Sequence, residues 1–564
     1  MGVPGFFLWL WKNYKKSNFV FTKSKMLDEH ILSELSNIDY LLIDANCLIH
    51  PVCFKVLADN KDLKNINKLE LKMMNAVLEY IDKLIKYVKP KEVYIAIDGV
   101  APIAKIKQQR SRRFKSVHDR VLFDNIKKKH GKEIPFFWSN SAITPGTDFM
   151  VKLHNKLYNW CQSQDYPIYY SSCNTPSEGE HKLLQFIRND VKNKENKYVI
   201  YGLDADLIFL ALSTGLDSIY LLREASEMDR TKSGDELNLV SIKIMRELLC
   251  DTIKNDIKNE IDIDIKLDDG RLIADFIFLC YLMGNDFLPH LPSLDIYNNA
   301  TGYLIKKYAN ILVQNNFEYL LDFKKINKKF FSEILEDVGE EEDDLLIKNF
   351  TNKKFKKCHS SDHYEREMFR IENMQFKFDD PIKLGSDNSI DWKERYYKHY
   401  FGEYNDGIVE DVVKEYLIRL QWITNYYFDK CSSWNWYYKY NHPPFLSDIS
   451  NHIDKFDFNK IKFKMGQPLK PYMQLLSVLP PQSAYLLPYN VKKCMLDHQS
   501  ELHHLYPTKI TYDYISKKKY WMVMPNLPNL EIDLIKSNFD KIKDKFDKND
   551  NLKNRIAKIY YFSK

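Results

Sequence analysis

Seven acidic side chains of this sequence stand close to apolar segments, at positions where several carboxylates could share cations. They are Asp44, Asp98, Glu178, Glu180, Asp204, Asp206 and Asp286. Gathered at one edge of a sheet, they would repel one another unless a cation neutralised them. Oxygen ligands without a histidine or cysteine cluster favour Mg²⁺ or Mn²⁺ over zinc, and two such ions suit in-line phosphoryl displacement. Each acid alone is also explained as a turn residue or a helix N-cap, so the set carries the prediction.

A cationic segment lies just downstream of Asp98. Arginine is uncommon in this chain, yet three of the four residues 110–113 are arginines. On a helix, four side chains at i, i+4 and i+7 or i+8 would share one face: Lys105, Gln109, Arg112 and Arg113. Guanidinium groups bind phosphate through paired hydrogen bonds, so this face would suit a terminal phosphate. A solvated basic helix face is the alternative, and the neighbouring Asp98 favours the phosphate site.

The elements that would position these side chains are short strands alternating with helices. Four apolar runs are rich in β-branched and aromatic residues and have the length of buried strands: 40–43, 93–97, 168–170 and 198–201. Helical patterns separate them, which is typical of an α/β fold with a mostly parallel central sheet flanked by helices. Ligands of such sheets bind beyond the carboxyl ends of the strands, where these acids stand.

The composition is typical of a large globular protein and excludes several classes. Of 564 residues, 45% are hydrophobic and 28% charged, and the formal net charge is +6, so neither a fibre nor a disordered chain is expected. The nine cysteines show no C-x-x-C spacing, which argues against a disulfide framework or zinc ribbon and for an intracellular location. No apolar run approaches about 18 residues, so no membrane-spanning helix is expected.

Four segments are predicted along the chain. Residues 1–300 form the core that carries the acids. Residues 301–390 are a linker or insertion, because the acidic run 336–344 and the basic run 353–357 are typical of solvated, mobile segments. Residues 391–530 form a largely helical, aromatic-rich second region that closes the site. Residues 531–564 have the pattern of a basic amphipathic helix.

The motifs that contain these residues resemble the XRN family of 5′→3′ exoribonucleases, within the flap-endonuclease-like or PIN-like nuclease group. The resemblance covers nearly the whole chain outside about 305–390 and the last thirty-odd residues. In order, the matching segments are MGVPGFF at the N-terminus, LLIDANCLIH at 41–50, AIDGVAPIAKIKQQRSRRF at 96–114, ITPGTDFM at 143–150, PSEGEHKLLQFIR at 176–188, YGLDADLIFLAL at 201–212, LLRE at 221–224, LMGNDFLPHLPSLDI at 282–296, DWKERYYK at 391–398, CSSWNWYY at 431–438 and QPLKPYMQLLSVLPPQSAYLLP at 467–488.

The resemblance implies a role for each candidate residue. All seven acids would hold two divalent cations. The 5′ monophosphate would lie in a basic pocket made of Lys105, Gln109, Arg112 and Arg113. The 5′ base would stack between His50 and a tryptophan, either Trp434, which is slightly favoured, or Trp436. Either tryptophan is equally well explained by core packing.

Four positions depart from the family pattern. Cys47 and Ser177 stand where glycine is usual, Ile103 replaces a basic residue, and Leu8 replaces an arginine. None is a cation ligand, so these departures concern the entrance and the affinity for the 5′ phosphate. The resemblance also implies a minimal catalytic core, without the long C-terminal extension of the large cytoplasmic members or the zinc knuckle of many nuclear members.

The predicted function is therefore a processive 5′→3′ exoribonuclease of RNA degradation. It would hydrolyse single-stranded RNA with a 5′ monophosphate to nucleoside 5′-monophosphates, using two Mg²⁺ or Mn²⁺ ions. A catalytically weak scaffold that binds RNA 5′ ends is one alternative, and the intact set of acids argues against it. A structure-specific 5′ nuclease on DNA is another, and the aromatic second region argues against that. A monomer without membrane attachment is expected, cytoplasmic rather than nuclear.

Overall fold

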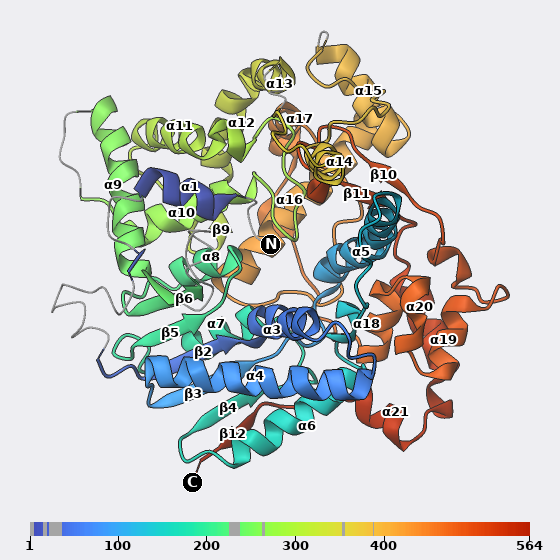
Figure 1. The fold of residues 1–564 in the computed structure, drawn as a ribbon. Coiled ribbons are helices and arrows are strands. Elements are labelled where there is room, and N and C mark those ends of the chain that lie inside the picture. Colours follow the sequence, from blue (N-terminus) through green and yellow to red (C-terminus); the bar gives the residue numbers. More distant parts are fainter. Residues whose placement is uncertain are drawn as a thin grey trace.

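A mostly parallel sheet forms the centre of the protein, and helices cover both of its faces (Figure 1). The computed structural model describes residues 5–14, 20–21, 36–224, 237–261, 266–351, 356–386 and 389–563. Within these residues the sheet has eight strands, in the order β1-β7-β6-β5-β2-β3-β4-β12. Their bounds are β1 (Val20–Phe21), β2 (Tyr40–Asp44), β3 (Glu92–Ala96), β4 (Ile168–Ser171), β5 (Tyr198–Tyr201), β6 (Ile219–Glu224), β7 (Leu237–Ser241) and β12 (Tyr560–Phe562).

The four apolar runs identified in the sequence are β2, β3, β4 and β5. These strands and β6 pair in parallel in the order β6-β5-β2-β3-β4, while β1, β7 and β12 add antiparallel pairs at the two sides. The predicted α/β fold class is therefore confirmed. Parallel pairing brings the carboxyl ends of β2, β3 and β5 to one edge of the sheet.

Alternate residues of the strands enter two separate hydrophobic cores, as the period of a strand requires. Leu41 and Ile43 of β2 face one core, which is covered by α3 (Ala45–Asp59), α4 (Ile66–Val88) and α6 (Asp148–Gln162). Leu42 faces the other core. That face is covered by α7 (Gly179–Asn189), α8 (Asp206–Leu212), α9 (Ile242–Glu260) and α10 (Asp269–Tyr281), with α1 (Phe6–Tyr14) beside them.

A helical region that begins at residue 300, and so extends beyond the predicted second region of residues 391–530, packs against this second face and continues its core. Its helices are α11 (Ala300–Gln314), α12 (Lys328–Glu340), α13 (Glu342–Thr351), α14 (His363–Glu372), α15 (Ser389–Phe401), α16 (Asp406–Phe428) and α17 (Leu446–His452). Two short hairpins accompany them: β8 (Leu321–Asp322) with β9 (Lys325–Ile326), and β10 (Thr511–Asp513) with β11 (Met524–Asn526).

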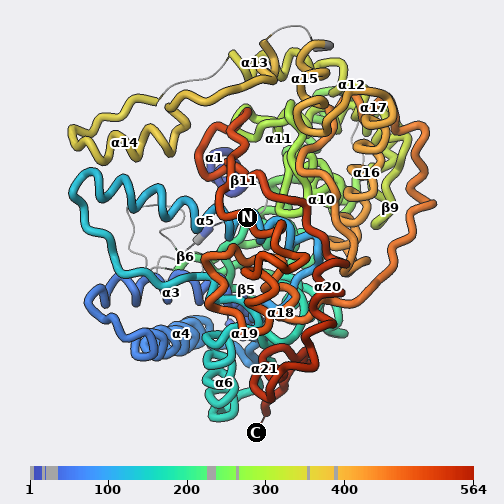
Figure 2. The backbone as a smooth tube through the Cα atoms, turned by 90° about the vertical axis from the view of Figure 1, so that its right-hand side faces the viewer, coloured from blue at the N-terminus to red at the C-terminus, as the bar shows by residue number. Residues whose placement is uncertain are grey.

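Helix α5 (Ile103–Lys129) connects the core to the second region. Its first turns pack on α18 (Pro471–Val478), and its outer half extends from the body beside α14 (Figure 2). Lys129 and His130 at the far end contact Glu367 of α14, at 2.8 and 2.6 Å.

Two expectations about the charged segments are wrong. The acidic run 336–344, expected to be solvated and mobile, belongs to α12 and α13; its other acids are exposed or half-buried as expected, but Glu342 is fully buried. Its carboxylate accepts hydrogen bonds from the backbone N–H groups of Leu446 and Ser447, both at 2.9 Å, and from the Ser293 hydroxyl at 3.0 Å. Much of the basic run 353–357 lies outside the described residues. The apolar face of α12 makes 328–340 part of the core rather than a linker.

The C-terminal segment is not one basic helix. Residues 531–563 form α20 (Ile532–Asp540), a 3₁₀ turn at Lys543–Lys545, α21 (Lys548–Lys553) and strand β12. Strand β12 pairs antiparallel with the edge strand β4, Tyr561 opposite Tyr169. This pairing fixes the C-terminus at the sheet and covers an open strand edge. Among the described residues, no helix is long and apolar enough to cross a membrane.

Candidate active site

The acids of the strands meet at the carboxyl edge of the sheet. Asp44 is the last residue of β2, and Asp98 comes two residues after β3. Asp204 follows β5, and Asp206 is the first residue of α8. Because β2 pairs with both β3 and β5, the three strand ends are adjacent. The backbone positions of Asp44, Asp98 and Asp204 therefore lie at one edge of the sheet, as predicted.

The N-terminus of α7 brings Glu178 and Glu180 to the same edge. The Gly179 N–H donates to Asp98 Oδ1 at 2.6 Å. A Cβ at Gly179 would lie 2.7 Å from Asp44 Oδ1, so only glycine permits this approach. The N-terminus of a helix also carries a partial positive charge that favours nearby carboxylates.

Ser177 precedes this helix in a conformation that favours glycine. Its φ is +100°. Its N–H donates to the Val100 carbonyl at 2.8 Å, and its carbonyl accepts from the Gly99 N–H at 2.9 Å, so two backbone hydrogen bonds hold the turn in place. The departure from the family's usual glycine therefore introduces backbone strain beside the acids. It leaves the carboxylates themselves in position.

Burial makes several of these carboxylates hard to ionise. Five of the seven acids are buried: Asp44, Glu178, Glu180, Asp206 and Asp286. Burial first, then repulsion from Asp98 and Asp204, raises the pKa of Asp44 to about 7. Burial and the charges of Asp204 and Asp286 likewise raise the pKa of Asp206 to about 7. The pKa of Glu180 is raised well above its ordinary value by burial and by Asp204 and Asp206.

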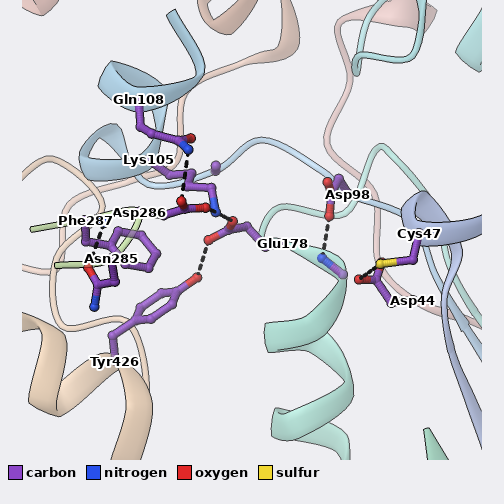
Figure 3. Close-up of polar contacts among 12 residues, drawn as sticks. Asp44, Cys47, Asp98, Lys105, Gln108, Glu178, Asn285, Asp286, Phe287 and Tyr426 are labelled. Carbon is purple, nitrogen blue, oxygen red and sulfur yellow. Dashed lines mark hydrogen bonds and ion pairs between the residues drawn. The ribbon is translucent and has the colours of Figure 1, made fainter. Parts of the chain in front are cut away.

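A lysine neutralises the other side of the site (Figure 3). Lys105 Nζ lies 2.5 Å from Glu178 Oε1 and 2.7 Å from Asp286 Oδ2. Gln108 Nε2 donates to Asp286 Oδ1 at 3.0 Å, and the Tyr426 hydroxyl donates to Glu178 Oε2 at 2.8 Å. Burial opposes charge on Asp286, but attraction to Lys105 prevails and its pKa is lowered. The sequence did not identify Gln108 or Tyr426 as part of the site.

The donor set fits a hard divalent cation. Asp44 Oδ1 and Glu180 Oε2 are buried, and no described residue donates a hydrogen bond to either. Oxygen ligands of this kind suit Mg²⁺ or Mn²⁺. Within the described part of the chain, no three acidic, histidine or cysteine side chains already stand close enough to enclose an ion. The predicted ligands therefore converge on one edge without forming a closed cage.

The predicted phosphate residues all lie on α5. Arg112 is exposed, while Gln109 and Arg113 are half-buried. Burial, followed by the charges of Arg113 and Arg112, lowers the pKa of His50 to about 4, so these arginines lie near the imidazole. Burial and Arg112 lower the pKa of Arg113 to about 10, and Asp98 partly offsets them. The cationic residues and His50 thus adjoin the acid edge.

The second region holds α5 in place beside the acids. The Ile103 N–H donates to the Trp434 carbonyl at 3.0 Å. The Lys107 ammonium donates to the carbonyls of Tyr438, Lys439 and Tyr440 at 3.0, 3.3 and 2.7 Å. Lys107 is a further residue that the sequence reasoning missed, although it stands within the motif that contains Lys105.

The two candidate tryptophans have different surroundings. The Trp436 ring stacks on Trp422 with centroids 6.2 Å apart, meets Phe463 edge-on and lies beneath Arg419. It is thus packed among aromatic residues. Trp434 is half-buried and packs against the same core as Trp436, but its backbone carbonyl contacts the first turn of α5. This position brings Trp434 next to the helix that carries the phosphate residues.

Cys47 contacts the acid edge directly. Its thiol donates to Asp44 Oδ2 at 3.1 Å and accepts from the Leu203 N–H at 3.4 Å. Burial and the charge of Asp44 raise the thiol pKa well above its usual value. Cys47 is therefore a neutral thiol that supports Asp44.

The structure thus places buried carboxylates at the carboxyl edge of a parallel α/β sheet, beside a cationic helix. Comparison with known proteins identifies the family. The model described as "XRN 5′-3′ exonuclease N-terminus" matches residues 1–225, and "Xrn1 helical domain" matches 266–377 and 347–563. The chain belongs to the XRN family of 5′-3′ exonucleases.

Curated relatives are similar over most of this chain. The 5′-3′ exoribonuclease 1 of Homo sapiens is 32% identical, covering 94% of this chain and 33% of the relative. The 5′-3′ exoribonuclease 2 of Debaryomyces hansenii is 26% identical, covering 99% of this chain and 72% of the relative. That of Arabidopsis thaliana is 28% identical, covering 94% and 66%. The chain thus spans between one third and about 70% of these relatives.

Proposed function

We propose that this chain is a processive 5′→3′ exoribonuclease that releases nucleoside 5′-monophosphates from single-stranded RNA with a 5′ monophosphate. The observation that carries the proposal is the edge of buried carboxylates beside the cationic face of α5. Family membership and the printed names of the relatives support the polarity and the RNA substrate.

The seven acids would hold two divalent cations, Mg²⁺ or Mn²⁺. When bound, such ions lower the pKa of a water nucleophile and stabilise the charge that develops on the phosphoryl oxygens. Glu180 and Asp44 have buried oxygens to which none of the described residues donates, so binding a cation would satisfy them. Tyr426 would fix the orientation of Glu178 through its hydroxyl.

Residues of α5 would bind the 5′ end of the substrate. Arg112 and Arg113 present guanidinium groups, which match the oxygens of a terminal phosphate, and Gln109 and Lys105 complete the pocket. A monophosphate would fit beside the acids, whereas a triphosphate or cap would be excluded by size. The anchoring of α5 by Lys107 and Trp434 would keep this pocket at a fixed distance from the acids.

The first base would stack between His50 and Trp434. Because its pKa is about 4, the His50 imidazole is neutral above that pH. A neutral, flat imidazole suits stacking on the first base. Trp436 is already packed against Trp422, which supports the choice of Trp434. Stacking is tolerant of base identity, as a degradative enzyme needs.

The test uses one RNA sequence labelled at its 3′ end, with either a 5′ monophosphate or a 5′ triphosphate, and reactions with Mg²⁺ or EDTA. We expect mononucleotide release from the monophosphate RNA only, and only with Mg²⁺. Internal fragments would contradict the exonuclease, and equal rates on both ends would contradict the phosphate pocket. Binding without cleavage in Mg²⁺ would instead indicate a 5′-end-binding scaffold.

A further inference from the structure

Lys105 stands between two groups of residues that the proposed function uses separately. Its ammonium contacts Glu178 Oε1 and Asp286 Oδ2, at 2.5 and 2.7 Å, and its side chain is only 8% exposed. With Gln108 and Tyr426, it leaves every oxygen of these two acids with a protein donor (Figure 3). All four carboxylate oxygens of Glu178 and Asp286 are therefore satisfied by protein groups.

The other half of the site is open. Asp44 and Glu180 each keep a buried oxygen to which no described residue donates. Their carboxylates lie among Asp98, Asp204, Asp206 and Glu178, and the charge of Lys105 only partly offsets burial and this repulsion at Glu180. Lys105 therefore makes ion pairs with Glu178 and Asp286, while its charge also acts on Glu180 and Asp204.

Lys105 cannot neutralise Glu178 and Asp286 while a divalent cation does so. An ammonium and a divalent cation at the same two carboxylates would repel each other at close range. A 5′ phosphate on the adjoining face of α5 offers the ammonium another anion. The long, flexible lysine stem allows this movement, while the hydrogen bonds of Ile103 and Lys107 keep the helix backbone in place.

We propose that Lys105 is an exchangeable internal counter-ion that couples cation binding at Glu178 and Asp286 to capture of the 5′ phosphate. This inference rests on the proposed function. Lys105 pairs with the two acids when the site is empty and turns to the phosphate when a divalent cation takes its place. By linkage, a bound phosphate tightens cation binding by the same factor as the cation tightens phosphate binding.

The coupling has a functional consequence. With Lys105 on the acids, the enzyme holds its second cation weakly and its carboxylates remain paired. Arrival of a 5′-phosphorylated end completes the cation site, whereas an end without a terminal phosphate cannot attract the ammonium. Lys105 would then select the substrate through assembly of the site as well as through direct contact.

The test measures Mn²⁺ binding to the full chain by electron paramagnetic resonance of the free ion, with adenosine 5′-monophosphate or adenosine. In the wild type we expect the phosphate to tighten the weaker Mn²⁺ site by about tenfold, and adenosine to have no effect. Lys105→Met should bind Mn²⁺ more tightly without nucleotide, because a competing charge is gone, and should lose most of the coupling. Circular dichroism would confirm folding, and Lys105→Gln serves if the first variant does not fold.

Arg112→Met is the matched control. It removes another cation of the proposed pocket. Arg112 is exposed, and its charge acts on Arg113 and His50. We expect weaker nucleotide binding with the coupling factor retained. A Lys105→Met protein with unchanged coupling, or with weaker Mn²⁺ binding, would overturn the inference. Wild-type coupling without any RNA hydrolysis would overturn the proposed exonuclease and leave the exchange of Lys105 standing.

Discussion

Buried carboxylates occur in both regions of this protein, and their surroundings are opposite. In the helical region, Glu342 accepts hydrogen bonds from two backbone N–H groups and two serine hydroxyls. Asp275 of α10, which packs against that region, accepts from the N–H groups of Leu320 and Leu321 and from the Tyr308 hydroxyl, all within 2.8 Å. At the sheet edge, Asp44 and Glu180 retain buried oxygens that have no such donor within the described part of the chain.

The difference separates acids that organise the fold from acids that await a ligand. A buried polar atom without a partner reduces stability, so a fold keeps one only where another requirement maintains it. At the sheet edge that requirement is the proposed binding of cations. Burial alone does not distinguish Asp44 and Glu180 from Glu342 and Asp275, but their hydrogen-bond donors do.

The largest effect on RNA hydrolysis is expected for Asp44, which has a buried oxygen without a described hydrogen-bond donor. Asp44→Asn removes a cation ligand, and a loss of several kcal/mol of transition-state stabilisation lowers RNA hydrolysis by roughly 10³-fold or more. Because the folded-state pKa of Asp44 is raised to about 7, the unfolded chain loses this proton at lower pH than the folded one, and the stability of the cation-free fold falls as the pH rises from about 4 to about 7. The gain in denaturant midpoint of the variant over the wild type in EDTA should therefore be largest at pH 8, smaller at pH 5 and absent near pH 4. Equal destabilisation at all three pH values would place Asp44 with the structural acids.

The opposite behaviour is expected for Glu342→Gln. The new amide NH₂ would point at one or more of the N–H or O–H groups that now donate to the carboxylate. The free energy of unfolding should therefore fall by about 3 kcal/mol. Urea unfolding measures this, with Asp344→Asn on the exposed side of the same acidic run as the control. Mn²⁺ binding by the folded protein should be unchanged. A variant that kept its stability but lost Mn²⁺ would remove the distinction between the two regions.

Tyr426→Phe tests a contact that joins the regions. It removes the hydroxyl that orients Glu178 and should weaken Mn²⁺ binding by roughly 10- to 100-fold. Tyr416→Phe on the same helix, whose hydroxyl contacts the Pro289 carbonyl at 3.5 Å, is the control. Equal losses in both variants would indicate disturbed packing of α16 rather than an effect on Glu178.

The smallest effect is expected at Cys47. A thiol is a weak donor, so Cys47→Ala should slow RNA hydrolysis by less than about fivefold, equivalent to about 1 kcal/mol. Cys53→Ala, in the buried face of the same helix, controls for packing. A loss as large as that of Asp44→Asn would make the thiol an essential support of the site.

The strands and their acids were predictable from the sequence because both signals are local. An apolar run followed by aspartate predicts a buried strand and its carboxyl end, and parallel pairing then brings Asp44, Asp98 and Asp204 together. The pairing of Lys105 with Glu178 and Asp286 was not predictable, since a lysine side chain can reach several partners. The contact of Tyr426 with Glu178 spans 248 positions, and nothing in the aromatic pattern of its helix marks it.

The errors at the charged segments have a related cause. A run of acids is usually solvated, and only its long-range partners Leu446 and Ser447 show that Glu342 is buried. Strand β12 is short and exists only because the edge of β4 is available to pair with it. Local patterns thus identify the residues of the site, while tertiary contacts decide which of them are neutralised.

The most direct test of the account compares the wild type with the double variant Asp204→Ala, Asp206→Ala on one 3′-labelled RNA with a 5′ monophosphate. Cleavage is followed in Mg²⁺, and RNA binding is followed under the same conditions. We predict that the variant leaves the RNA intact while binding it about as tightly as the wild type. Continued release of mononucleotides, or loss of binding to the same degree as loss of cleavage, would contradict the assignment of the acid edge as the cation-dependent catalytic centre.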